Sequence, residues 1–510
     1  MDLLHLPNIS VDLGIIQKQT ITGSVISYLG VLLGFVTTGI LFPQLFSTAE
    51  NGVIKLLVAN AALFGQLGTL GFSGVITRMF TYFRDKKTNH HGFMRIGILV
   101  STGGFVFTAL VFYLLKDWIL IGKDIADGEM IGNFVGFVIP MILATVFFHL
   151  FDNYYKVLFN AVKGSLYREV YQRVFTLALI VVYYYSAMNF WYFILLYVAG
   201  YGIPTLMLLV SLMRDGEFSL KKDQGFVSPG LKREIIHVSF YNIIIGFSNI
   251  AILNIDSIMI NRLVGLNETG IYSIAFFFGT LVVIPSRMLM KISGAFLADA
   301  WKDDDLGQIK SIYYKTSINQ FIIGCLILVG LWGNIDNVYN ILPPEFEPGR
   351  YVILLIGMTN LVEMLGGASA TIISVSPRYK VLSYMLIVLL VFIVVTNLWL
   401  IPLMGINGAA LASLLSYTVY VLLRYLYLYR SYKLQPLSFN HIKVIIIALI
   451  TYGLQSLIPV FEHFILDIAI RSLVMIILYS SLAYIWRTSD ELVSVVLLII
   501  SKLRGIIHKK

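Results

Sequence analysis

Residues 379–429 read YKVLSYMLIVLLVFIVVTNLWLIPLMGINGAALASLLSYTVYVLLRYLYLY. Two apolar blocks, 379–401 and 405–429, flank the short segment PLM, and each has about the 20 residues that an α-helix needs to cross a hydrocarbon core roughly 30 Å thick. The whole 510-residue chain follows the same pattern, because 58% of its residues are hydrophobic and only 13% are charged. The short alternating segments typical of a membrane β-barrel are not seen. The sequence therefore predicts an all-α polytopic membrane protein.

Apolar runs separated by charged or turn-rich segments predict about fourteen transmembrane helices. The fifth and sixth spans are the least distinct, because only SAMNF separates them. The basic-ended segment 490–510 is apolar but short, so we predict an interfacial helix on the inner leaflet, with a further span as the alternative. The fourteen spans lie near residues 20–42, 53–77, 93–115, 131–151, 174–188, 191–213, 235–260, 269–290, 316–334, 351–376, 379–401, 405–429, 441–460 and 464–486.

The Lys and Arg residues divide unequally between the loops on the two sides. One set of alternate loops, together with both termini, holds 31 of the 37. Cytoplasmic loops of membrane proteins carry the excess of Lys and Arg, so both termini are predicted to be cytoplasmic in an inner (cytoplasmic) membrane. The net charge of +9 is then explained by topology, and no nucleic-acid partner is expected. The other side holds Lys55, Lys116, Lys123, Arg262, Arg350 and Arg471.

Two further features narrow the class of protein. The N-terminal residues have neither a basic n-region nor a small-residue cleavage site, so no cleaved signal peptide is expected. The single cysteine, Cys325, lies in an apolar run and excludes a disulfide framework within the chain.

The two halves of the chain resemble each other. Segment 42–57 aligns without gaps on segment 260–275, matching Glu50 with Glu268 and Gly52 with Gly270. Two parallel six-helix repeats about an axis along the membrane normal are a known transporter architecture, so we expect two six-helix bundles related by a pseudo-two-fold repeat, plus two extra C-terminal helices. The expected parts are an N-terminal bundle at 1–213, a cytoplasmic linker at 214–234, a C-terminal bundle at 235–433, and the two added helices with a basic amphipathic tail at 434–510.

Three segments carry a family resemblance. They are YLGVLLGFVTTGILFPQLFSTAENG (28–52), DSIMINRLVGLNETGIYSIAFFFGTLVVIPSRM (256–288) and IPLMGINGAALASLLSYTVYVLL (401–423). In this order they resemble polysaccharide-biosynthesis flippases (Wzx type) of the multidrug/oligosaccharidyl-lipid/polysaccharide exporter (MOP) superfamily. The resemblance implies a central cavity that opens alternately to each side and moves an oligosaccharide on a polyprenyl (pyro)phosphate carrier outward. Related lipid II flippases carry an Arg after the Ala of the Tyr-x-x-Ala motif, where this chain has Phe276.

A lipid-linked sugar has an anionic head, so its path needs cations and hydrogen-bonding groups. In span seven, Asn242, Asn249 and Asp256 recur every seven residues and share one helix face to within about 20° per step. Glu363 lies near the middle of span ten, where an ionisable group usually faces an interior or a water path. We predict that Asp256 and Glu363 couple transport to an ion. The alternatives are an interfacial carboxylate for Asp256 and a structural hydrogen bond for Glu363.

Four cations complete the predicted site. Arg287 and Lys291 are four residues apart and share a face of span eight, where they could meet a pyrophosphate. Lys55 and Arg78 lie near opposite ends of span two. The alternative for these side chains is snorkelling to lipid headgroups. The predicted substrate-binding residues are therefore Lys55, Arg78, Asn242, Asn249, Arg287 and Lys291.

We expect neither catalytic residues, nor a metal site, nor a cofactor. The predicted partners are the polyprenyl-linked glycan, membrane lipids, and a polysaccharide polymerase and glycosyltransferases. One alternative is an ion-coupled drug or organic-cation antiporter of the same superfamily, which would favour an acidic, aromatic cavity. A membrane polysaccharide polymerase or ligase is the other alternative, but it would need a sizeable outer loop, and the longest outer loop is NIDNVYNILPPEFEPGR.

Overall fold

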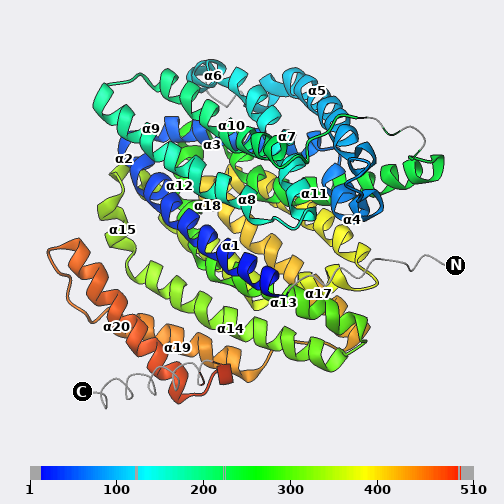
Figure 1. The fold of residues 1–510 in the computed structure, drawn as a ribbon. Coiled ribbons are helices and arrows are strands. Elements are labelled where there is room, and N and C mark those ends of the chain that lie inside the picture. Colours follow the sequence, from blue (N-terminus) through cyan, green and yellow to red (C-terminus); the bar gives the residue numbers. More distant parts are fainter. Residues whose placement is uncertain (1–12, 121–124, 222, 224–225, 492–493, 495–510) are drawn as a thin grey trace, which may run out of the picture. The chain divides into compact units, whose positions relative to one another are not determined.

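The computed structural model describes residues 13–120, 125–221, 223, 226–491 and 494 (Figure 1). Within these ranges every regular element is a helix and no strand occurs. This confirms the predicted all-α architecture. The predicted interfacial helix at 490–510 lies almost entirely outside the described residues.

The chain divides into two compact units. Unit 1 comprises residues 1–41, 57–118 and 132–250, and unit 2 comprises residues 42–56, 119–131 and 251–510. Three of the five divisions fall inside α3 (Thr48–Gly68), α5 (Phe93–Leu120) and α11 (Pro229–Leu263), so these helices contribute to both units.

Unit 1 packs its helices around an aromatic core. Phe72, Phe80, Phe93 and Tyr154 are all almost fully buried in this core, which joins α4, α5 and α7. The α7 helix also packs on α10, and α10 packs on α9. The other helices of unit 1 are α1 (Leu13–Gly34), η1 (Phe35–Leu41), α4 (Phe72–Phe83), α7 (Val138–Val157), α8 (Val162–Leu166), η4 (Tyr167–Tyr171), α9 (Gln172–Ser186) and α10 (Phe190–Arg214).

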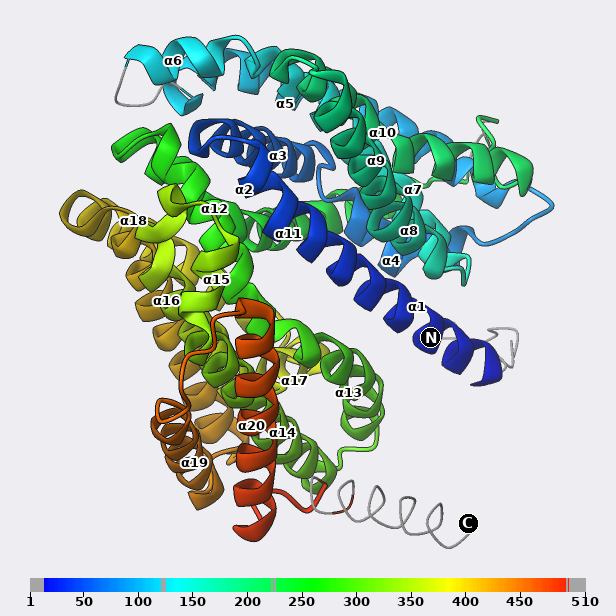
Figure 2. The ribbon, with the colours of Figure 1, turned by 90° about the vertical axis from the view of Figure 1, so that its left-hand side faces the viewer.

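Unit 2 is arranged around α14 and α16. The α14 helix contacts α13, α16, α19 and α20, and Figure 2 shows α19 and α20 side by side next to it. The main helices are α12 (Leu266–Thr280), α13 (Ile284–Lys302), α14 (Leu306–Gly333), α16 (Arg350–Leu365), α17 (Ser369–Val375), α18 (Lys380–Tyr432), α19 (Phe439–Gln455) and α20 (Phe464–Ile485), with the shorter α2 (Phe42–Leu45), α6 (Ile125–Gly132) and α15 (Ile335–Ile341) between them.

The long α18 is a hairpin of two spans. The hydroxyls of Thr396 and Ser416 lie 3.2 Å apart although 20 residues separate them, which a straight helix rising 1.5 Å per residue cannot achieve. The chain reverses at Gly405, whose φ of 58° and ψ of −134° are readily adopted only by glycine. This turn separates the predicted spans 379–401 and 405–429.

The described residues accommodate about fourteen spans. Nine helices are long and apolar enough to cross a membrane, and two bent pairs, α3 with α4 and α16 with α17, raise the number to eleven. The two halves of α18, the shorter α19 and the continuous helical segment from α8 to α9 account for the others. The protein is therefore a multi-pass membrane protein.

The repeated segments of the two halves meet in unit 2. A side chain at Gly52 would collide with the Leu266 carbonyl, and one at Gly270 would collide with the Thr48 carbonyl. Because Thr48 and Gly52 align with Leu266 and Gly270, these two contacts are equivalents of each other. Reciprocal contacts of this kind are what a two-fold axis between matching elements produces, so the glycines are matched because each permits the same close helix crossing.

Two sequence interpretations are corrected. The fifth span was predicted to begin at 174, but the helix begins at Val162 and continues through η4 and α9. Arg168 and Arg173 therefore lie within a helix and not in a loop. Arg424 was counted with the cytoplasmic loops when the Lys and Arg residues were divided between the two sides, although it lies within the predicted span 405–429. In the structure its side chain is fully buried within unit 2. In both cases charged residues that lie within a helix were interpreted as part of a loop between spans.

Candidate functional site

Asp256 is the centre of a buried polar network in unit 2. Its Oδ1 accepts a hydrogen bond of 2.7 Å from Asn397, and its Oδ2 accepts bonds of 2.8 Å from Tyr272 and 2.7 Å from Ser413. Asp256 is only 4% exposed, and Asn397 and Ser413 are also buried. The three donors come from α12 and from both halves of α18. The network therefore ties together four spans.

Three donors are needed because the carboxylate is buried. A carboxylate taken out of water loses far more solvation than one hydrogen bond returns, and bonds to a charged group contribute about 1.5–3 kcal/mol each. Asn397 and Ser413 can converge on Asp256 only because the chain reverses at Gly405 and brings the two halves of α18 together.

Lys55 lies beside this network. Its Nζ donates to the Asn254 Oδ1 at 3.4 Å and interacts electrostatically with Asp256. The same ammonium lies 5.8 Å from the centre of the Phe276 ring, within cation–π range. The structure thus brings together Lys55 and Asp256, two of the eight predicted site residues, from segments about 200 residues apart in the chain.

Glu363 forms a second polar centre with Arg424. The Arg424 Nη1 donates to Glu363 Oε1 at 3.0 Å, and its Nη2 makes a second bond to Oε2. The Arg424 side chain is fully buried, whereas that of Glu363 is 31% exposed. The guanidinium also lies 4.2 Å from the Tyr420 ring centre. A bidentate pair of this kind fixes both side chains and joins α16 to α18.

The other predicted residues are placed differently. Arg287 and Lys291 are exposed on α13 of unit 2, and Arg78 is exposed on α4 of unit 1. Asn242 and Asn249, in the unit 1 part of α11, each donate to a carbonyl four residues earlier on their own helix. Asn242 also packs closely against Gly74. Roles for these five residues in substrate binding remain predictions.

Sequence reasoning missed four members of the two centres. Asn397 and Arg424 could have been identified from the sequence, because each is a strongly polar residue within an apolar block. Tyr272 and Ser413 could not have been identified in this way, since tyrosine and serine are common at helix contacts. Within the described residues, no group of three or more His, Cys, Asp or Glu side chains is arranged to hold a metal ion.

No family model and no curated protein sequence matches this chain. Solved structures do match its fold. A lipid II flippase MurJ in an inward closed conformation matches with a TM-score of 0.74 and 11% identity, over 91% of this chain and 98% of the flippase. An inward-facing multidrug resistance MATE family transporter of the MOP superfamily matches with a TM-score of 0.62 and 11% identity, over 79% and 93% of the two chains.

A eukaryotic MATE transporter, AtDTX14, has a TM-score of 0.57 and 14% identity, with 82% of this chain and 94% of that one covered. These comparisons define a fold class that includes a lipid II flippase and MATE family multidrug transporters. The particular protein described here has this fold over nine-tenths of its length.

Proposed function

We propose that this protein is a transporter that moves polyprenyl-(pyro)phosphate-linked oligosaccharide from the cytoplasmic to the outer leaflet by alternating access, for surface polysaccharide assembly. The observation that carries the proposal is Lys55, an intramembrane cation placed beside Asp256 in a chain with a flippase fold. A cation in a low-dielectric site is costly unless it has a partner, and such residues mark substrate or ion pathways. A phosphate is a suitable partner for it.

Lys55 also explains the departure at Phe276. The resemblance to lipid II flippases leads one to expect an arginine there, and this chain supplies a ring instead. The Lys55 ammonium lies over that ring. Lys55 of α3 therefore places a positive charge next to position 276 of α12, which has no charge of its own. In the proposed function Lys55 contacts the substrate phosphate, and Asp256 balances the ammonium while the phosphate is absent.

Glu363 and Arg424 are proposed to couple transport to a proton. Protonating Glu363 would remove the charge that balances the buried Arg424, and breaking a buried pair in this way costs about 3–5 kcal/mol. Proton binding would therefore favour a rearrangement of α16 against α18. Glu363 suits this role because it is the partly exposed member of the pair.

The test is transport by the full-length protein in liposomes containing a short-chain polyprenyl-pyrophosphate oligosaccharide in one leaflet. Wild type should equilibrate the lipid between leaflets, and Lys55→Met should slow this at least tenfold. Lys116→Gln, which removes a cation at the end of α5, is the matched control. In cells, depletion should accumulate sugar-loaded carrier on the inner leaflet. Normal surface glycan together with altered drug resistance would refute the proposal.

The second candidate is a drug or organic-cation antiporter. It is favoured by the fold match to multidrug transporters and by the buried Asp256 with its Tyr272 partner, an acidic and aromatic combination. Proton-driven export of ethidium from the same liposomes, abolished by Asp256→Asn and unaffected by Lys55→Met, would establish it. In the first proposal the polymerase and glycosyltransferases that make and use the glycan are the protein partners, and the inner membrane is the location.

A further inference from the structure

The fifth span carries a further cluster of charged residues. Arg168, Glu169, Gln172 and Arg173 occupy η4 and the start of α9, within the continuous helix that begins at Val162. The η4 segment is a π-helix, an irregularity that is frequent at functional sites. Charged residues within a transmembrane helix are rare and mark substrate or ion pathways.

One of the two arginines is neutralised. The Arg173 Nη2 lies 2.9 Å from Glu169 Oε2. Both side chains lie against Gly30 and Gly34 of α1, where any larger residue would collide with them. This pair has a structural explanation, because it fills a groove that the two glycines leave open.

Arg168 has no such partner. Its guanidinium lies 4.9 Å from the Phe148 ring centre, but no described residue forms a hydrogen bond or an ion pair with it. The side chain has five donors, and Arg168 keeps part of its surface exposed. Its guanidinium is therefore available to a ligand.

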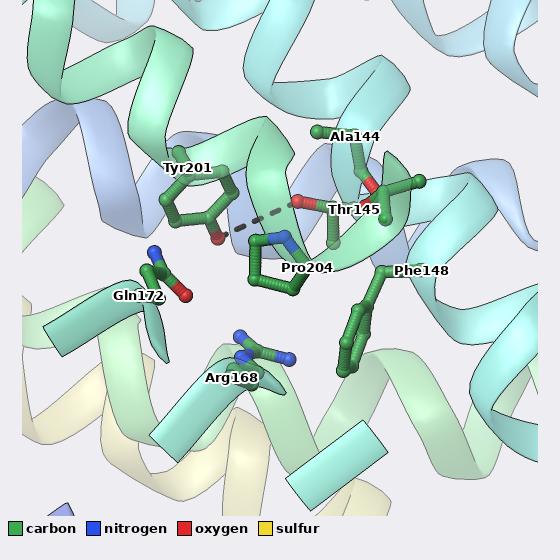
Figure 3. A pocket seen from close by; sticks show the side chains of 8 residues that line it. Ala144, Thr145, Phe148, Arg168, Gln172, Tyr201 and Pro204 are labelled. Atoms are coloured by element: carbon green, nitrogen blue, oxygen red, sulfur yellow. Dashed lines mark hydrogen bonds between the residues drawn. The ribbon is translucent and has the colours of Figure 1, made fainter. Parts of the chain in front are cut away.

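A small cavity lies next to Arg168 within unit 1. Figure 3 shows Arg168, Gln172 and Tyr201 turned toward a common space beside Pro204. The Tyr201 hydroxyl is 3.5 Å from that of Thr145, and the Gln172 amide makes no hydrogen bond with a described residue. The cavity has a volume of about 10 Å³, enough for one water-sized oxygen.

The cavity lies beside the middle of a candidate membrane span, α10. Tyr201 lies near the midpoint of α10, about 17 Å along the axis from one end and about 20 Å from the other. Arg168, Gln172 and Tyr201 each keep part of their surface exposed. A ligand of this site therefore presents a small anionic oxygen at a depth that free ions do not reach without an apolar carrier.

We infer that Arg168, Gln172 and Tyr201 form a binding site for one oxygen of a phosphate on an isoprenoid lipid. The guanidinium supplies the charge and a fork of donors that matches phosphate, while Gln172 and Tyr201 supply neutral donors. The inference rests on the proposed function for its ligand class. It adds a site formed by residues of unit 1, whereas Lys55 and Asp256 belong to unit 2.

Equilibrium binding of radiolabelled farnesyl phosphate to the detergent-solubilised full-length protein tests the inference. Wild type should bind it saturably, and Arg168→Gln should weaken binding about tenfold to a hundredfold, the effect of one lost charge-assisted bond. Arg168→Lys keeps the charge but loses the fork, so its affinity should fall between those two. Lys116→Gln removes a positive charge elsewhere in unit 1 and should bind like wild type.

Thermal unfolding separates a binding role from a structural one. If Arg168 awaits a ligand, Arg168→Gln should leave the ligand-free protein as stable as wild type or more stable, while abolishing the stabilisation by farnesyl phosphate. A residue needed only for packing would lower the unfolding temperature of the ligand-free protein. That result would overturn the inference.

Farnesol and inorganic phosphate test whether the site recognises both the phosphate and the isoprenoid chain of the ligand. Farnesol binding as tightly as farnesyl phosphate, or inorganic phosphate competing at equal concentration, would overturn the assignment to a lipid phosphate. Proteoliposomes keep this inference apart from the proposed function. Tight farnesyl phosphate binding through Arg168 without transport would refute the function alone, and unchanged transport and binding in Arg168→Gln would refute this site alone.

Discussion

At the residue scale, two polar centres of unit 2 hold buried charged residues, one at Asp256 and one at Glu363 and Arg424. Glu363 was predicted from its depth in an apolar block, and the structure adds Arg424, which a charge census assigned to a loop. The division of Lys and Arg residues between the two sides misplaced Arg424 because a basic residue near the end of a span is assigned to the adjacent loop. Arg424 lies only a few residues from the end of the predicted span 405–429. Pairing between residues 61 positions apart cannot be obtained from the local pattern of either helix.

A double-mutant cycle tests the Glu363–Arg424 pair. Glu363→Gln alone should destabilise the folded protein by about 3–5 kcal/mol, because it leaves the fully buried guanidinium without a charge partner. Replacing both residues by Met should recover most of that loss. The measurement is the midpoint of denaturant unfolding in detergent for the wild type, the two single variants and the double variant. Additive losses would contradict a direct pair.

At the element scale, the turn inside α18 determines the Asp256 network. Gly405 reverses the chain with a positive φ, and Asn397 and Ser413 meet at Asp256 as a consequence. The sequence predicted the two spans but not their convergence, because hydropathy shows where a helix lies and not which face it turns to its neighbour.

Gly405→Ala should destabilise the protein by about 1 kcal/mol or more and weaken transport, because a side chain at this φ is strained. The strain would shift the two halves of α18 and move donors away from Asp256. Gly453→Ala, in α19, is the matched control, because the structure leaves open space for its methyl group. That variant should be neutral or slightly stabilising. Equal unfolding temperatures for the two variants would contradict this account of the turn.

The contacts that Lys86 and His90 make with Glu217 in unit 1 are predicted to make the stability of the protein depend on pH. Burial of Glu217 opposes its ionisation, but hydrogen bonds from Lys86 and His90 outweigh burial and hold the pKa of this carboxyl below its usual range. A carboxyl with a lowered folded-state pKa stabilises the fold above its unfolded pKa. That stabilisation is lost as the pH falls through the folded value.

Unfolding temperatures measured between pH 7 and pH 3 test the contribution of Glu217 to stability. Wild type should lose stability below about pH 4.3, the ordinary glutamate value, and Glu217→Gln should be less stable at pH 7 and less dependent on pH. Glu234→Gln, at an exposed position in α11, is the control and should follow wild type. Parallel curves for Glu217→Gln and wild type would exclude a contribution from this carboxyl.

At the scale of the whole molecule, composition and periodicity were sufficient for the fold class and the approximate number of helices. The repeat between 42–57 and 260–275 also has a physical counterpart, since its glycines make reciprocal close contacts at Leu266 and Thr48. The candidate site was harder to predict. Within unit 2, only Lys55 and Asp256 of the predicted residues come together, because sites in bundles are assembled from side chains of distant spans.

Topology is the remaining prediction at this scale, and the chain is well suited to test it. Its single cysteine, Cys325, is buried, so wild type should not react with a membrane-impermeant maleimide in intact cells. A predominance of Lys and Arg on one side predicts that Lys116→Cys faces outward and Lys302→Cys faces the cytoplasm. Only the first variant should be labelled in intact cells, and both should be labelled after permeabilisation. Labelling of Lys302→Cys but not Lys116→Cys in intact cells would reverse the orientation, and with it the proposed direction of lipid transport.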